Sequence, residues 1–175
     1  GYRNKAQYPV GYGRVGNLIS GFYARRSHRI IPNSECPLQP ALFGAVQAEI
    51  LSFLKQFHIP AYDETKHTGL IRHIYLRQAA VTGEMMVCLV STSPKLPHAK
   101  ELTARLSEAF PEIKSIVLNV NPRPTNVILG DSCITLCRSD TITDSVCGVT
   151  VSLPPLSFYQ VNHAPAAVLY PKALV

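Results

Sequence analysis

The sequence lacks several features that would place it at once in a large class of proteins. No apolar run approaches the ~18 residues that a membrane-spanning helix needs, so no membrane partner is expected. The first five residues are polar and lack the apolar region of a secretion signal. Because the cysteines number five, an odd count, free thiols are expected rather than a disulfide framework. These absences favour a cytoplasmic protein.

Motifs of several common enzyme classes are also missing. The sequence contains no glycine-rich phosphate loop, no Gly-x-Ser-x-Gly and no convincing carboxylate pair. Its histidines do not show metal-ligand spacing. Cys133 and Cys137 have alternating neighbours that could place both on one side of a strand, but the second close-spaced pair of a zinc site is absent. A metal-binding or redox protein that uses these two cysteines is one alternative interpretation.

Acidic residues are absent from the first 34 positions, which carry the whole net charge of +6. The basic residues there are Arg3, Lys5, Arg14, Arg25, Arg26 and Arg29. In the rest of the chain, 11 basic residues balance 11 acids. A concentrated positive charge is typical of a surface that binds a polyanion such as RNA, although a solvated basic sheet face would have the same composition.

The same segment predicts a small antiparallel sheet. Residues 2–10 alternate between polar and apolar positions, residues 18–24 suit a second strand, and residues 28–31 suit a short third one. Tyrosine and arginine are interleaved in these strands. Such a face can stack on unpaired bases while its charges hold phosphates.

Beyond residue 34 the pattern predicts an α+β fold. A helix is expected to open at residues 34–37, to carry its apolar stripe over residues 38–57 and to end at Pro60; a second helix is expected over residues 98–110. Strands are expected at residues 70–80, 84–91 and 113–120, the last being central because it is almost entirely apolar. This order gives two layers: an antiparallel or mixed sheet with both helices on one face.

The last third of the chain predicts short strands followed by a helix. The strands are expected at residues 127–129, 133–137, 141–143 and 146–151, and the helix at residues 164–174. Between them lies a turn, Ser157-Phe158-Tyr159-Gln160-Val161-Asn162. An amide side chain in front of a helix N-terminus is a common way to hold a small ligand, because it offers a donor and an acceptor beside unpaired backbone N–H groups.

Four stretches of the chain resemble the RNA uridine-5-methyltransferase family, whose members make 5-methyluridine in ribosomal and transfer RNA. They are Tyr2-Arg3-Asn4-Lys5-Ala6-Gln7; Arg29-Ile30-Ile31 followed by Cys36-Pro37-Leu38; Gly69-Leu70-Ile71-Arg72-His73; and the turn that ends at Asn162. The subgroup that the chain resembles is the 23S rRNA (uracil-5-)-methyltransferase type that carries an iron–sulfur cluster. The resemblance implies S-adenosylmethionine as methyl donor and RNA as partner.

The resemblance also implies roles for single residues. Gln160 would contact S-adenosylmethionine, Phe158 would lie beside the target base, and Asn162 would cap the following helix. Cys36 would be the fourth ligand of a 4Fe-4S cluster whose other three cysteines lie outside the chain, so it is expected to be free here. The RNA-binding residues are expected to be Arg3, Lys5, Arg25, Arg26 and His28. If Arg72 is buried, it is expected to pair with an acid.

Finally, the resemblance implies a domain organisation. Residues 1–121 would form the central RNA-binding domain. Part of this segment, residues 1–34, could also contribute to the neighbouring catalytic domain. Residues 122–175 would form a linker and the N-terminal edge of the methyltransferase domain. The attacking cysteine, the general base and the glycine-rich donor loop would follow, so this internal fragment is expected not to catalyse the reaction. The alternative from another class is a non-catalytic RNA-binding module.

Overall fold

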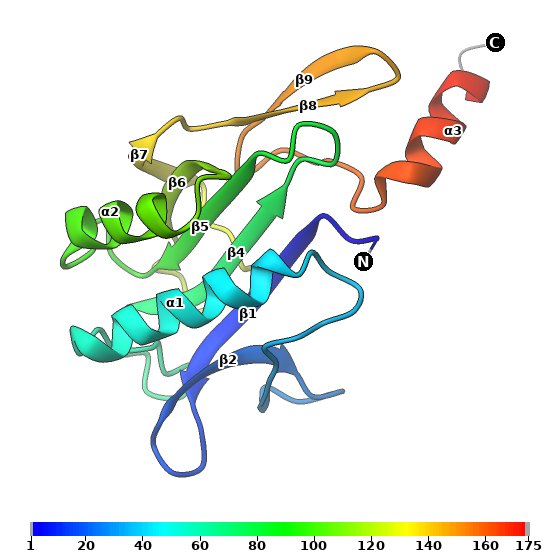
Figure 1. Ribbon diagram of the computed structural model, residues 1–175. Helices are drawn as coiled ribbons and strands as arrows, with labels where there is room; N and C mark the ends of the chain where they lie inside the picture. Colours follow the sequence, from blue (N-terminus) through cyan, green and yellow to red (C-terminus); the bar gives the residue numbers. More distant parts are fainter. Residues whose placement is uncertain (1, 174–175) are drawn as a thin grey trace.

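A computed structural model describes residues 2–173 (Figure 1). Nine strands and three helices occur in this part of the chain. The strands are β1 (Lys5–Tyr12), β2 (Leu18–Tyr23), β3 (Ile30–Pro32), β4 (Ile71–Gln78), β5 (Met85–Ser91), β6 (Ile113–Val120), β7 (Ser132–Arg138), β8 (Ile142–Val146) and β9 (Val149–Leu153). The helices are α1 (Leu42–Gln56), α2 (Ala99–Ala109) and α3 (His163–Ala173).

Seven strands form one mixed sheet in the order β3-β2-β1-β4-β5-β6-β7. Every pair is antiparallel except β5 and β6, which run parallel and are joined through α2. The predicted α+β class and two-layer arrangement are thus confirmed. The strand β6 lies inside the sheet but second from its edge, and β4 occupies the centre. The apolar character of β6 therefore reflects burial on both of its faces rather than a position at the centre of the sheet.

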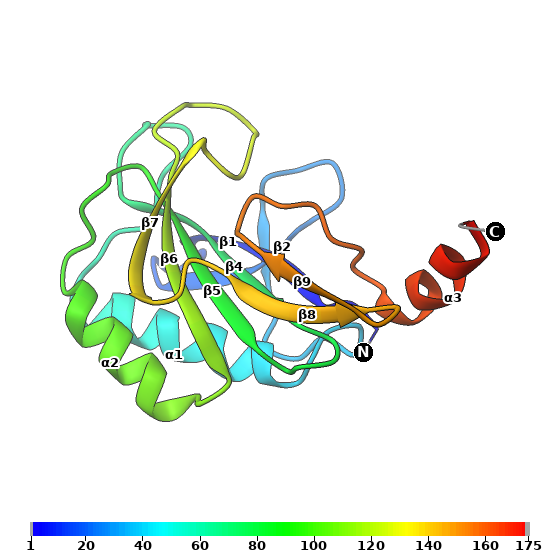
Figure 2. The ribbon, with the colours of Figure 1, turned by 90° about the horizontal axis from the view of Figure 1, so that it is seen from above.

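Helices α1 and α2 cover one face of this sheet (Figure 2). Phe43, Val46, Ile50, Phe53 and Leu54 recur at three- and four-residue spacing along α1 and are fully buried. In α2, Leu102 and Leu106 are buried in the same way. Together with the inward residues of β1, β4, β5 and β6 they form the main hydrophobic core.

Helix α1 begins later than predicted, at Leu42. Residues 34–41 form turns, and Leu38 remains exposed. The reason is Pro40: its ring disfavours a helical conformation at Gln39, so a helix started at residue 38 could not continue. As predicted, the helix ends before Pro60: its last residue is Gln56, and His58 takes a positive φ of 52°.

The opposite face of the sheet carries the β8–β9 ribbon (Figure 2). Ile142 and Leu153 of this ribbon pack on Tyr75, Met86 and other outward residues in a second, smaller core. No strand forms at the predicted residues 127–129, because the Asn121 side-chain amide donates to the carbonyls of Val127 (2.7 Å) and Ile128 (3.1 Å). None of the helices within residues 2–173 has the length and apolar character needed to cross a membrane.

Strand β7 corrects the expectation that Cys133 and Cys137 could share a side. Its register against β6 shifts between Thr135 and Cys137. Cys133 therefore lies beside Asn119, whose amide donates to its sulfur at 3.3 Å, whereas Cys137 packs against the helix-side core. A bulge reverses the alternation, and the two thiols point to opposite faces.

Candidate functional site

The turn at residues 157–162 connects β9 to α3, and a buried arginine of the sheet holds its first residue by hydrogen bonds. Arg77 lies on β4 with only 2% of its surface exposed. Its guanidinium donates to the Ser157 carbonyl (2.7 Å), to Ser157 Oγ (3.1 Å) and to the Pro154 carbonyl (3.2 Å). Because a planar guanidinium fixes the direction of each bond, this contact sets where the turn starts.

Two further anchors hold the rest of the turn. The Asn4 side-chain amide donates to the Gln160 carbonyl and the Asn4 N–H donates to the Val161 carbonyl, both at 2.9 Å. On the other side, the Tyr159 hydroxyl donates to Asp144 at 2.8 Å. The backbone of the turn is therefore fixed from three separate elements.

Asp144 is a buried acceptor in this arrangement. It also accepts hydrogen bonds from the backbone N–H groups of Ala80 (2.8 Å), Val81 (2.9 Å) and Ser145 (2.9 Å). Burial by itself would raise the pKa of Asp144, but the hydrogen bonds outweigh burial and hold the pKa below its ordinary value. The pKa of Tyr159 is raised by burial and by its bond to this carboxylate. Asp144 is thus ionised and Tyr159 protonated at neutral pH.

By contrast, the two side chains predicted to meet ligand and base point outward. Phe158 is 82% exposed, a high value for a phenylalanine, and Gln160 is exposed as well. Gln160 is anchored through its carbonyl, so its side-chain amide is available to a ligand. Beside the turn lies a hollow of about 500 Å³ lined by Arg3, Asn4 and Asn162. Arg3 and Asn162 form an isolated β-bridge there, and α3 begins at the residue after Asn162.

The N-terminal end of β1 places positive charge next to this turn. Lys5 on β1 lies directly opposite Arg77 on the neighbouring antiparallel strand β4. Burial lowers the pKa of Lys5, and the positive charges of Arg77 and Arg3 lower it further. No carboxylate forms an ion pair with Arg3, Lys5 or Arg77 in the part of the chain that the structure describes. Such a group of like charges is stabilised when an anion binds beside it.

The other predicted RNA-binding residues lie elsewhere. Arg25 and Arg26 occupy the exposed turn between β2 and β3, where Arg26 has a φ of 56°. His28, which follows them, makes an ion-pair contact with Glu64. The structure therefore divides the predicted set into two groups: Arg3 and Lys5 at the Gln160 turn, and Arg25, Arg26 and His28 at the β2–β3 turn.

Contrary to prediction, the buried Arg72 does not pair with an acid among residues 2–173. Its guanidinium donates to the carbonyls of Asn121 (3.1 Å), Arg123 (2.5 Å) and Thr125 (2.7 Å) and lies 4.8 Å from the centre of the Tyr62 ring. Backbone carbonyls of the loop after β6 thus accept the hydrogen bonds that a carboxylate was expected to accept. Arg72 therefore anchors the connection between β6 and β7.

Cys36 lies in the segment before α1, two residues before Leu38, whose carbonyl accepts from the Arg3 N–H at 2.8 Å. It lines a hollow of about 560 Å³ with Tyr8, Gln39 and Phe43, is half-buried and is not in a disulfide. Among residues 2–173, no three histidine, cysteine or acidic side chains gather as they would around a metal. One thiolate does not hold a four-iron cluster, so the residues present do not fit that group.

Sequence reasoning missed the side chains that hold the turn: the buried Arg77, Asn4 and Asp144, and the half-buried Tyr159. One signal was available for the first of them. Arg77 is a charged residue in a strand whose apolar residues, such as Ile74 and Leu76, predict burial, and a charge buried there needs specific hydrogen-bond partners. The partners themselves lie 77 to 80 residues further along the chain and carry no local signal.

Comparison with known proteins gives relatives for nearly the whole chain. No family model matches it. An uncharacterized RNA methyltransferase of Halalkalibacterium halodurans is 45% identical over 173 residues, which cover 99% of this chain and 38% of that protein. An uncharacterized RNA methyltransferase of Clostridium tetani is 40% identical over 173 residues, again 99% of this chain and 37% of the relative. The chain thus spans under two-fifths of the length of these curated relatives.

One solved structure shares the fold. It is a tRNA (uracil-54, C5)-methyltransferase of Pyrococcus abyssi in complex with S-adenosyl-L-homocysteine, with a TM-score of 0.81 and 22% sequence identity. The match covers 99% of this chain and 40% of that chain. In sequence, then, this chain is similar along nearly its whole length to one segment of proteins named RNA methyltransferases, and in fold to part of a solved tRNA methyltransferase.

Proposed function

We propose that this chain is part of an S-adenosylmethionine-dependent RNA methyltransferase that methylates carbon 5 of a uridine in ribosomal or transfer RNA. In this proposal the chain supplies an RNA-binding surface and one side of the donor site. The observation that carries it is the rigid turn at residues 157–162, which presents Phe158 and Gln160 to solvent beside the positive charge of Arg3 and Lys5. The similarity to named RNA methyltransferases supports the same reading.

The chemistry at the turn would be divided between two side chains. The Gln160 amide can donate to and accept from the methyl donor, which when bound supplies an activated methyl group. Phe158 can stack on a uracil ring that has left its helix, and Arg3 and Lys5 can hold the phosphates that flank it. The division into residues 1–121 and 122–175 stays a prediction; the proposed boundary falls between β6 and β7, which pair in one sheet.

The 4Fe-4S cluster that the resemblance implies stays a prediction: Cys36 would be its fourth ligand, and the described residues supply no other. A non-catalytic RNA-binding module would need the same positive charge. It would not need the Gln160 side-chain amide, which the anchored turn presents to solvent, and this observation favours the methyltransferase.

The test is binding of the chain to a fluorescein-labelled, uridine-containing RNA stem-loop, followed by anisotropy over a salt series. The variant Arg3→Ala/Lys5→Ala/Arg25→Ala/Arg26→Ala loses four predicted phosphate contacts. The slope of log K against log [salt] should therefore become shallower by about three to four units. Lys55→Ala/Lys100→Ala, which changes two lysines at the helix-covered face, is the control and should leave the slope unchanged. Absence of binding by the wild type at low salt would refute the proposed RNA surface.

A further inference from the structure

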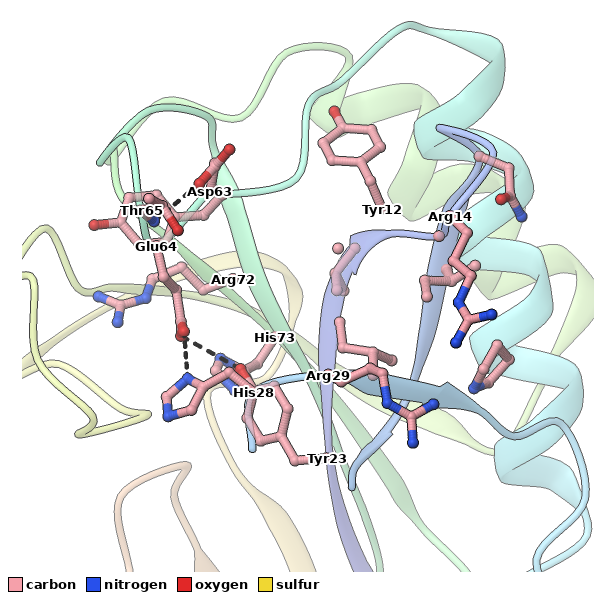
Figure 3. A pocket seen from close by; sticks show the side chains of 18 residues that line it. Tyr12, Arg14, Tyr23, His28, Arg29, Asp63, Glu64, Thr65, Arg72 and His73 are labelled. Atoms are coloured by element: carbon pink, nitrogen blue, oxygen red, sulfur yellow. Dashed lines mark hydrogen bonds and ion pairs between the residues drawn. The ribbon is translucent and has the colours of Figure 1, made fainter. Parts of the chain in front are cut away.

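A third hollow, of about 610 Å³, lies away from the Gln160 turn (Figure 3). It opens between the β1–β2 turn, the β2–β3 turn and the loop at residues 62–65. The lining residues on which the argument depends are Tyr12, Tyr23, His28, His73, Arg14 and Arg29. Its volume falls within the range of roughly 300–1,000 Å³ that is usual for small-ligand sites.

One wall of the hollow is aromatic and held in place. The ring of Tyr23 lies 5.1 Å from that of His28, at 37°, and 6.4 Å from that of His73, at 83°. The Tyr23 hydroxyl donates to Glu64 at 3.3 Å, and His28 contacts the other oxygen of the same carboxylate (Figure 3). Tyr23 is nevertheless 38% exposed, so a fixed aromatic ring is open to a flat ligand.

His73 has unused hydrogen-bonding capacity at this wall. It is only 5% exposed, yet neither Nδ1 nor Nε2 has a partner in the described structure. Burial, aided by the charge of Arg72, lowers the pKa of His73 to about 4, so the ring is neutral at pH 7 and offers one donor and one acceptor. Both ring nitrogens are buried, so a base reaches them only when a neighbouring side chain such as Tyr23 shifts; the bond formed then recovers free energy that the unpartnered nitrogens cost.

The opposite side of the hollow carries the positive charge. Figure 3 shows the side chains of Arg14 and Arg29 together, away from the Glu64 cluster. Both arginines are exposed, and neither pairs with a carboxylate within residues 2–173. Glu64 would repel a phosphate on the aromatic side, whereas the arginines would attract one on theirs. The hollow therefore suits a ligand that is flat and polar at one end and anionic at the other.

We propose that this hollow binds one unpaired nucleotide of RNA, with its base on Tyr23 and His73 and its phosphate toward Arg14 and Arg29. The inference rests on the proposed function and adds a second nucleotide site to it, distinct from the Phe158–Gln160 turn. His73 and Arg77 are four residues apart on β4, which corresponds to about 13 Å along the strand.

The test uses the whole chain and a fluorescein-labelled oligouridylate of eight nucleotides. Tyr23→Leu removes the stacking ring and should weaken binding by roughly 5- to 150-fold, the range for loss of one base–aromatic stack. Tyr23→Phe keeps the ring and should bind within about twofold of the wild type. His73→Phe keeps the ring shape, removes both nitrogens and should weaken binding as well. A blunt RNA duplex should bind wild type and Tyr23→Leu equally, because its bases are paired.

A second measurement does not depend on variants. Oligouridylate that contains 4-thiouridine is cross-linked to the wild-type chain, and the linked peptides are identified by mass spectrometry. Cross-links at residues 12–29 or 62–73 are expected. Cross-links found only elsewhere, or a Tyr23→Leu variant that folds and binds as tightly as the wild type, would overturn the hollow as a nucleotide site while leaving RNA binding intact. Failure of the wild type to bind any RNA would instead overturn the proposed function, and this inference with it.

Discussion

Replacement of Arg77 tests how the turn that carries Phe158 and Gln160 is held. In Arg77→Met, the Ser157 carbonyl and hydroxyl and the Pro154 carbonyl lose the guanidinium as a donor, although the Pro154 carbonyl still accepts from the Ser157 N–H and hydroxyl. The contact of the guanidinium with the Tyr75 ring, at 5.5 Å, is lost as well. Methionine is unbranched and apolar and can follow the aliphatic part of the arginine side chain, but it ends before the guanidinium and replaces none of its hydrogen bonds.

The magnitude follows from two opposing effects. Three hydrogen bonds from a charged donor contribute roughly 1.5–3 kcal/mol each, or about 5–9 kcal/mol before any offset. Removal of a buried charge returns several kcal/mol of desolvation. We expect the free energy of unfolding to fall by about 2–4 kcal/mol, which for a chain of this size lowers Tm by roughly 5–15 °C. Arg77→Lys keeps the charge but loses the planar fork, so an intermediate loss is expected.

Urea unfolding followed by circular dichroism measures the loss, and amide hydrogen exchange locates it. Faster exchange in Arg77→Met should concentrate at residues 154–162. Arg25→Met, at an exposed arginine in the β2–β3 turn, is the matched control and should change stability by no more than about 0.5 kcal/mol. If Arg77→Met unfolds at the same urea concentration as the wild type and residues 154–162 exchange no faster, Arg77 does not hold the turn.

Two further predictions concern pH. Asp144→Asn should cost about 2 kcal/mol at pH 7, because the amide cannot accept all the bonds that the carboxylate accepts. The pKa of Asp144 lies below its ordinary value of 3.8, so the stability that the ionised carboxylate contributes is complete above that value and is lost as the pH falls through the lowered pKa. The urea midpoints of variant and wild type should therefore converge as the pH is lowered below 3.8, and a constant difference would contradict this. The pKa of His73 is lowered from 6.5 to about 4, so the unfolded chain binds the extra proton first and stability should fall as the pH drops from 6.5 toward 4. Between pH 7.5 and pH 5 the wild type should lose about 2 kcal/mol more than His73→Phe, and equal losses would show that His73 is not the group responsible.

Local pattern predicted most elements to within a few residues, and the exceptions have identifiable causes. Helix α1 starts after Pro40 rather than near residue 38, because proline acts on the residue before it. The expected strand at residues 127–129 is absent because an asparagine side chain takes up its carbonyls. The bulge in β7 separates Cys133 from Cys137, and alternation in the sequence does not reveal where a strand bulges.

The sequence by itself determined the α+β class, the periodic core of α1, the concentration of positive charge before residue 35 and the exposed turn with Phe158 and Gln160. Each of these depends on residues close together in the chain. Only the tertiary structure decided which polar groups meet: Asn4 reaches Gln160 across 156 positions, and Arg77 reaches Ser157 across 80. It also brought Tyr23, Glu64 and His73 around one hollow. A buried hydrogen bond forms between groups that strand pairing places side by side, and that pairing is a property of the whole fold rather than of any local pattern.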